Sequence, residues 1–226
     1  MNLATRMLSV ISLALGFVFT PAFADDDSHE SFRVLSAQWW QWATSIPVAS
    51  NPVADTTGAN CFVGQRGTIW FLAGTSNSKP VVRTCSVPEG APLFFPVVNV
   101  INVNTPGVGG QVNQDKSVAV LRAEAAPYVD TANGLKVLLD NREIKAIRRV
   151  RSIVFAAVFP QPNLFGDTTL VPGRIYSPAI DDGFYVKLNG LPAGQHHLKI
   201  QGELPAFPAS VDVDYILNVV KVTLKD

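Results

Sequence analysis

The chain has 226 residues, of which 47% are hydrophobic and 16% are charged, with 18 basic side chains against 18 acidic ones. A neutral chain offers no electrostatic footprint for nucleic acid or for an anionic membrane surface, so the composition argues against both partners. The length suits one large β domain or two small ones.

Residues 1–24 have the pattern of a cleaved secretory signal peptide. A positive charge at Arg6 precedes an apolar run over about residues 8–19, and residues 22–24 (AFA) form a small-x-small cleavage site. An apolar run of roughly a dozen residues is too short to span a bilayer, which takes about 20, so an anchor helix is the weaker alternative. We therefore expect residues 25–226 to be exported to the periplasm or the extracellular space, without a membrane span.

An amphipathic helix is predicted over residues 28–46. Asp27 and Glu30 have the spacing of a capping box, and Pro47 ends the pattern. The apolar residues between them recur at helical spacing within a core-facing stripe of about 100°: Phe32, Leu35, Trp39, Trp42, Ala43 and Ile46.

Trp40 lies outside this stripe. It falls about 100° from Trp39, on the side of the helix that carries Arg33. A tryptophan left in water would indicate recognition, because its large ring supplies contact area. The alternative is that the turn-rich segment 47–60 covers the ring. With Tyr176, a second aromatic residue predicted to be exposed, Trp40 and Arg33 are the candidate binding residues.

The chain has two cysteines, Cys61 and Cys85. In an oxidising compartment an isolated pair predicts a disulfide, and closing a loop of about 25 residues would stabilise the fold by roughly 3 to 3.5 kcal/mol. The spacing fits neither a CxxC redox motif nor a zinc finger.

Three apolar, strand-like runs follow the helix, at residues 68–74, 81–87 and 92–103. Their short connections predict two antiparallel hairpins, buried on both faces and covered by the tryptophan-bearing helix. Pro96 within the third run predicts an edge position or a bulge there.

Segment 104–116 is loose and marks a candidate internal boundary, and a short helix ending at Pro127 is predicted after it. The rest reads as β structure, with a hairpin turn at Asp140-Asn141. The remaining strands are predicted in segments 149–160, 182–204 and 211–226.

These elements predict a mainly β fold: a single domain over residues 25–226, built as an antiparallel β-sandwich, immunoglobulin-like or jelly-roll-like, with an N-terminal helix and a second short helix. Segments "DGFYVKLNGLPAGQHHLKIQGEL" and "VDVDYILNVVKV" resemble the final strands of extracytoplasmic bacterial domains of immunoglobulin-like character. Residues 134–226 as a whole are similar to a group of uncharacterised secreted bacterial proteins. The resemblance implies architecture and export, and no activity.

No motif fixes a reaction. There is no Gly-x-Ser-x-Gly elbow, and the GVGG run lacks the context of a phosphate-binding loop. The least poor catalytic candidates are His196, Tyr185 and Asp182, although a histidine that bonds to backbone is the favoured interpretation of His196.

Charged runs in the sequence point to no metal or cofactor. Residues 25–27 and 181–182 are acidic but lack the oxygen-ligand spacing of a calcium loop. The basic run 148–151 (RRVR) would either contact an anion or form a solvated strand end paired with the carboxylates of 212 and 214, and the second is favoured.

The sequence thus favours an exported, non-catalytic binding or assembly protein of the cell envelope or extracellular space. The partners it predicts are an envelope glycan or another exported protein. An extracytoplasmic polysaccharide hydrolase or lyase is the alternative. Nothing in the sequence specifies an oligomeric state.

Overall fold

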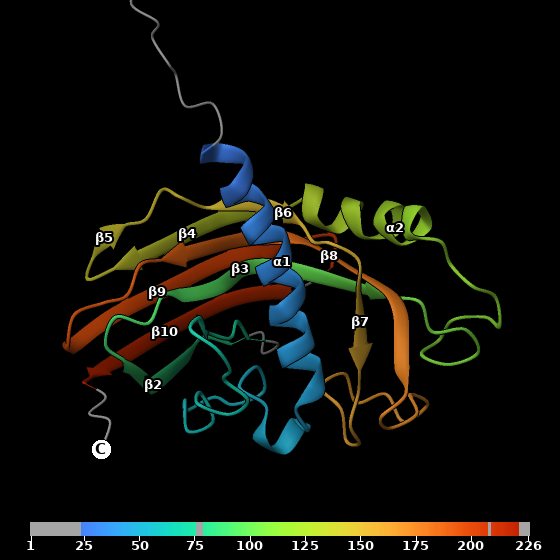
Figure 1. The fold of residues 1–226 in the computed structure, drawn as a ribbon, viewed down its shortest axis with the longest axis horizontal. Coiled ribbons are helices and arrows are strands. Elements are labelled where there is room, and N and C mark those ends of the chain that lie inside the picture. The colour runs from blue at the N-terminus through green and yellow to red at the C-terminus, as the bar shows by residue number, and fades with distance from the viewer. Residues whose placement is uncertain (1–23, 76–78, 208, 222–226) are drawn as a thin grey trace, which may run out of the picture.

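The computed structural model describes residues 24–75, 79–207 and 209–221, with side chains from residue 31 onward. Within these residues the chain forms two five-stranded sheets and two α-helices (Figure 1). Sheet A contains β1 (Trp70–Phe71), β3 (Leu93–Val103), β8 (Ile175–Leu188), β6 (Arg148–Arg151) and β7 (Phe155–Val158), with β7 pairing with β8. Sheet B contains, in spatial order, β2 (Val81–Pro88), β10 (Ala209–Val220), β9 (Gly194–Leu204), β4 (Asn133–Leu139) and β5 (Arg142–Glu143).

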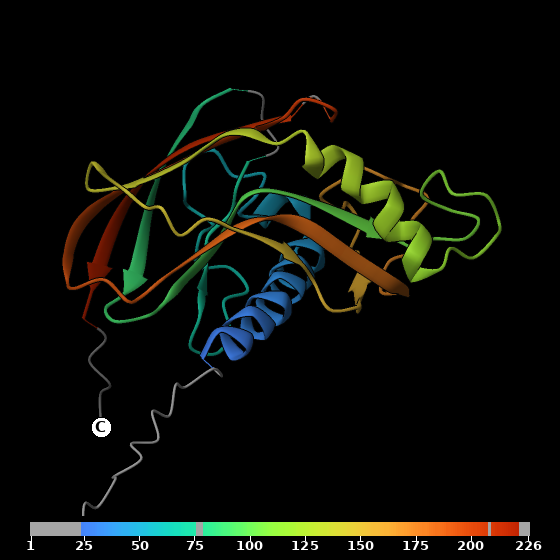
Figure 2. The ribbon, with the colours of Figure 1, turned by 90° about the horizontal axis from the view of Figure 1, so that it is seen from above.

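The helices are α1 (Ala24–Ser45) and α2 (Val118–Asp130), and a 3-10 turn, η1 (Val48–Ser50), follows α1. Figure 1 shows α1 running steeply across the strands, and Figure 2 shows it on one side of sheet A with sheet B and α2 on the other side. No helix among the described residues combines the length and apolar character needed to cross a membrane.

Sheet A is buried on both faces, because successive side chains of its strands point alternately into two hydrophobic cores. On one face, Phe94 and Tyr185 pack in a cluster with Trp39 of α1. On the other face, Phe95 and Val186 pack in a cluster with residues of sheet B. Farther along this second face, α2 covers sheet A through a small cluster of Leu121, Ala125 and Ile180. The continuous apolar character of β3 follows from this double burial.

Both sheets are mixed, which corrects the prediction of purely antiparallel sheets and of two hairpins between residues 68 and 103. β1 pairs in parallel with β3, and β2 pairs in parallel with β10. The prediction failed because a short linker excludes parallel pairing only between the two strands that it connects. Here β2 lies in sheet B and itself connects β1 to β3 of sheet A. β8 and β9, which follow one another in the chain, likewise belong to different sheets.

Other local predictions had mixed outcomes. The bulge predicted at Pro96 is confirmed, since the β3–β8 register shifts between Pro96 and Val98. The turn at Asp140-Asn141 is confirmed as well, with φ of 49° and 63°, as a two-residue type I′ hairpin requires. The predicted end of α2 at Pro127 is wrong: the helix continues to Asp130, because Val129 is buried and holds the last turn against the fold.

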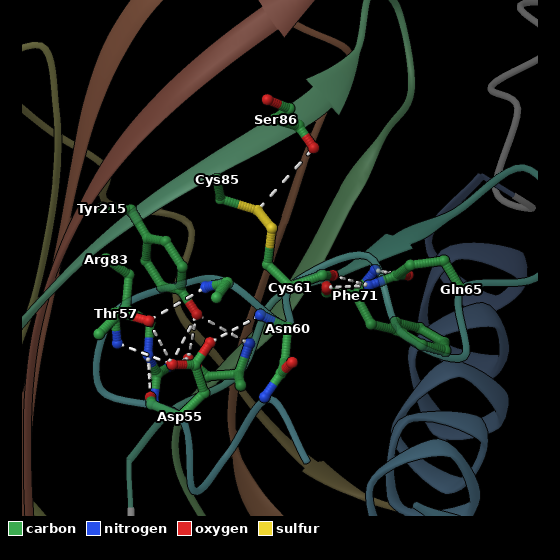
Figure 3. The surroundings of a disulfide bond; sticks show 12 residues. Asp55, Thr57, Asn60, Cys61, Gln65, Phe71, Arg83, Cys85, Ser86 and Tyr215 are labelled. Carbon is green, nitrogen blue, oxygen red and sulfur yellow. Dashed lines mark hydrogen bonds between the residues drawn. A yellow bond between two sulfur atoms is a disulfide. The ribbon is translucent and has the colours of Figure 1, made fainter. Parts of the chain in front are cut away.

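The disulfide between Cys61 and Cys85 is present and ties the segment before β1 to β2 (Figure 3). Next to it, the buried guanidinium of Arg83 donates hydrogen bonds to the carbonyls of Val53, Asp55, Ala73 and Gly74 and to the hydroxyl of Tyr215. This buried arginine holds an irregular segment against sheet B, since it satisfies carbonyls that no strand pairs.

Candidate aromatic groove

The indole N–H groups of the three clustered tryptophans each donate to a different part of the fold. Trp39 donates to the carbonyl of Leu72 and Trp42 to the carbonyl of Val63, both at 2.9 Å. Both rings are buried, which confirms the prediction that they face the core. Trp40 donates instead to a side chain, the carboxyl Oδ1 of Asp181 on β8, at 2.7 Å.

Trp40 is therefore buried, with its indole N–H bonded to sheet A, so the prediction that its ring is left in water is wrong. Its exposed fraction is 7%. The outer side of the ring stacks with Phe165, with ring centroids 6.4 Å apart and planes 28° apart. Phe165 lies in the loop between β7 and β8 and is itself 49% exposed. The buried ring of Trp40 and the half-exposed ring of Phe165 thus form one aromatic pair that reaches the surface.

A polar chain lies beneath Trp40. Tyr185 donates its hydroxyl hydrogen to Asp181 Oδ1 at 2.8 Å, and the amide of Asn99 donates to the Tyr185 hydroxyl at 2.9 Å. Burial raises the pKa of Asp181 well above its ordinary value, although the bonds from Trp40 and Tyr185 oppose this shift. Burial and the nearby Asp181 carboxyl likewise raise the pKa of Tyr185. Both groups are thereby held toward their neutral forms.

Two adjoining cavities, of about 660 Å³ and about 260 Å³, have Trp40, Asn99, Phe165 and Phe207 in common among their lining residues. Tyr128 of α2 lines the larger cavity and packs edge-to-face with Phe207, at 5.6 Å between ring centroids. We call the two cavities together the aromatic groove. Its walls are the two ring pairs Trp40–Phe165 and Tyr128–Phe207.

The floor of the aromatic groove is the open edge of β3. Along this strand β8 pairs on one side through Val103, whereas β1 pairs on the other side only at Leu93 and Phe94. Among the described strands, none pairs with that second side beyond Phe94. An unpaired strand edge presents backbone N–H and C=O groups. The groove therefore combines aromatic walls with backbone and amide hydrogen-bonding groups along its floor.

Several residues of the aromatic groove were missed by sequence reasoning: Asn99, Tyr128, Phe165 and Phe207. A signal existed for two of them. Phe165 ("NLFGD") and Phe207 ("PAFPAS") are large apolar rings in turn-rich segments, where polar residues are usual. Tyr128 and Asn99 carried no such signal, because only the packing of α2 and the open edge of β3 bring them together.

Two candidate binding residues do not lie in the groove. Tyr176 is 2% exposed, so the prediction that it is exposed is wrong: its ring packs against Phe159, and its hydroxyl accepts the N–H of Val171 at 2.8 Å. Arg33 contacts the backbone of β6, donating from Nε to the carbonyl of Arg151 at 3.2 Å. It faces a separate, arginine-lined cavity.

The structure does not bring His196 together with Tyr185 and Asp182. His196 lies on β9 of sheet B, where its Nδ1 is 2.7 Å from Asp140 and its Nε2 is 3.1 Å from the carbonyl of Pro192. The bond to Asp140 raises the pKa of His196. Tyr185 and Asp182 lie on β8 of sheet A, and their side chains point to opposite faces. The three side chains therefore form no common site.

Comparison of the chain with protein-family models, with curated proteins and with solved structures finds no match.

Proposed function

We propose that the chain is an exported, non-catalytic binding protein whose aromatic groove holds a neutral oligosaccharide, such as an envelope glycan. The observation that carries this proposal is the pairing of aromatic walls with a hydrogen-bonding floor in one groove. The groove has a combined lining of Trp40, Phe165, Tyr128 and Phe207 around Asn99.

A sugar ring matches this arrangement chemically. Its C–H faces are apolar and stack on aromatic rings, whereas its hydroxyl groups both donate and accept hydrogen bonds. Asn99, Asn102 and Glu124 line the larger cavity and offer amide and carboxylate groups for such hydroxyls. The lining residues of the two cavities include no lysine or arginine. Charge complementarity therefore favours a neutral sugar chain over an acidic one.

We also propose that the chain is exported and that it has the fold expected from the sequence. The disulfide is compatible with an oxidising compartment outside the cytoplasm. The two packed sheets would form a β-sandwich of the immunoglobulin-like or jelly-roll-like kind, with α1 as its amphipathic N-terminal helix. The chain would be related to the secreted bacterial proteins that residues 134–226 resemble.

The test is a titration of the purified protein with neutral cello-, malto- and chito-oligosaccharides, followed by calorimetry and by tryptophan fluorescence. We expect saturable binding of at least one series. Phe165→Ala and Phe207→Ala should each weaken it about ten-fold, because each removes one exposed wall at little cost to the core. Phe62→Ala is the matched control, since this ring is 65% exposed and lies outside the groove.

The proposal fails if none of the three series binds, or if Phe62→Ala weakens binding as much as the two groove variants do. Binding of extended peptides in place of sugars would also contradict it. That result would assign the open edge of β3 to strand addition by another polypeptide.

A further inference from the structure

A third cavity, of about 500 Å³, lies at the edge of sheet A and is lined by four arginines. Arg33 comes from α1, Arg122 from α2, and Arg149 and Arg151 from β6. Arg149 and Arg151 alternate with the buried Val150, so both side chains lie on the same side of β6. Three separate elements thus direct guanidinium groups toward one cavity.

Among the described side chains, two carboxylates pair with the arginines of β6. Arg149 donates to both oxygens of Asp182 at 3.0 Å, and its Nη1 lies 2.7 Å from the exposed Asp130. Arg151 shares the same Asp182, with Nε 3.3 Å from Oδ2. The predicted pairing of this basic run with the carboxylates of 212 and 214 is wrong, because both of those pair with Lys199. One buried carboxylate therefore serves two arginines.

Arg122 adds a charge that makes no ion pair among the described residues. Its Nη2 donates to the carbonyl of Ser152 at 2.7 Å, and its buried Nη1 has no hydrogen-bond partner. Burial lowers the pKa of Arg122, and the positive charges of Arg33 and Arg151 lower it further. A guanidinium normally satisfies its N–H groups, so the unbonded Nη1 is a donor that an anion in this cavity could use.

The backbone around the cavity is firmly held. The N–H of Ile153 donates to the carbonyl of Arg33, which joins α1 to the chain just after β6. Two hydrogen bonds link Ser152 to Asp181. The N–H of Ser152 donates to the carbonyl of Asp181 at 3.0 Å, and the N–H of Asp181 donates to the Ser152 hydroxyl at 2.8 Å. The backbone positions of Arg33 and Arg151 are thereby held near one another before any ligand arrives, which lowers the entropic cost of binding.

We propose that this arginine-lined cavity binds a tetrahedral oxyanion of the phosphate or sulfate class, either free or as part of a larger molecule. Such an anion has several acceptor oxygens and matches the planar N–H forks of converging arginines. Its negative charge would lie beside Arg122, which makes no ion pair among the described residues. This site is separate from the aromatic groove and does not depend on a sugar binding there.

The experiment measures the binding of inorganic phosphate, sulfate and glycerol 3-phosphate to the whole protein by calorimetry, with chloride and acetate at matched ionic strength as comparison anions. We expect saturable binding of at least one tetrahedral oxyanion and a higher melting temperature in its presence. Tighter binding of glycerol 3-phosphate than of free phosphate would identify the source as an esterified group, and the reverse order would identify the free ion.

Two variants connect the binding to the cavity. Arg33→Gln and Arg151→Gln are each expected to weaken it about ten-fold, because each removes a charge-assisted donor. Both side chains are partly exposed, so these variants should fold, whereas a change at Arg122 could disturb packing. Arg142→Gln is the matched control, because Arg142 is exposed on β5 of sheet B. Equal effects of chloride or acetate, or unchanged affinity in both cavity variants, would overturn the proposal.

Discussion

Asp181 is the residue whose environment differs most from that of an ordinary carboxyl group. It is fully buried, its Oδ1 accepts from Trp40 and Tyr185, and its Oδ2 has no hydrogen-bond partner. Its pKa is raised well above 3.8, chiefly by burial. Between the unfolded and the folded pKa, the folded chain therefore binds more protons than the unfolded chain. The free energy of unfolding must fall as the pH rises through that interval.

Asp181→Asn is expected to remove this pH dependence. The amide oxygen can still accept from Trp40 and Tyr185, but the side chain no longer ionises. The difference in unfolding free energy, variant minus wild type, should therefore shift in favour of the variant as the pH rises above the ordinary pKa of 3.8. Urea denaturation of both proteins at each pH measures it. A difference that stays constant with pH would show that Asp181 titrates normally.

For single residues, the sequence predicted which side of a helix is buried but not which residues the buried side chains contact. The helical spacing of Trp39 and Trp42 predicts their burial, because it depends only on local geometry. The cover of Trp40 could not be predicted, since Asp181 lies 141 residues away. Arg83 shows the same limit: nothing in a strand pattern reveals that its side chain will be buried among carbonyls from four other positions.

Among the elements, β2 illustrates what fixes an irregular segment to a sheet. Its side chains alternate between buried and exposed, with Arg83 buried and Val82 exposed, so the prediction of burial on both faces is wrong for this strand. Arg83 and Cys85 point inward from it, so one hydrogen-bonding side chain and one disulfide both attach the chain before β1 to the same strand. The sequence indicated the pairing of Cys61 with Cys85 because only two cysteines exist. It did not indicate that β2 belongs to the other sheet from β1 and β3, because that choice depends on long-range packing.

Loss of the disulfide should destabilise the protein without changing its fold. Replacing both Cys61 and Cys85 with serine removes the closed loop, which is expected to lower the unfolding free energy by about 3 kcal/mol. For a protein of this size, that corresponds to a fall in melting temperature of roughly 6 to 12 °C. Calorimetry measures the change.

The double variant also supplies its own control. A reducing agent should lower the melting temperature of the wild-type protein and leave that of the double variant unchanged. An unchanged wild-type value under reduction would contradict the stabilising role of the bond.

The whole molecule is expected to unfold as one unit. Sheet A is buried between α1 and sheet B, so separating the sheets would expose the inward residues Phe95 and Val186. Tryptophan fluorescence reports chiefly on the contact of α1 with sheet A, and far-ultraviolet circular dichroism reports on both sheets. We expect the two signals to give the same urea midpoint. Two separate midpoints would instead divide the chain at the candidate boundary, segment 104–116.

The pairing of β2 with β10 also determines the order in which the chain can fold during synthesis. β2 is an edge strand, and β10 is its partner among the described strands. The ribosome must therefore add more than a hundred residues after β2 before that strand can be hydrogen-bonded in its sheet. Such long-range pairing slows folding, since the chain loses the entropy of closing a long loop before the stabilising contacts form. A nascent chain halted before residue 209 would hold β2 without its neighbour, an exposed edge open to chaperones or to aggregation.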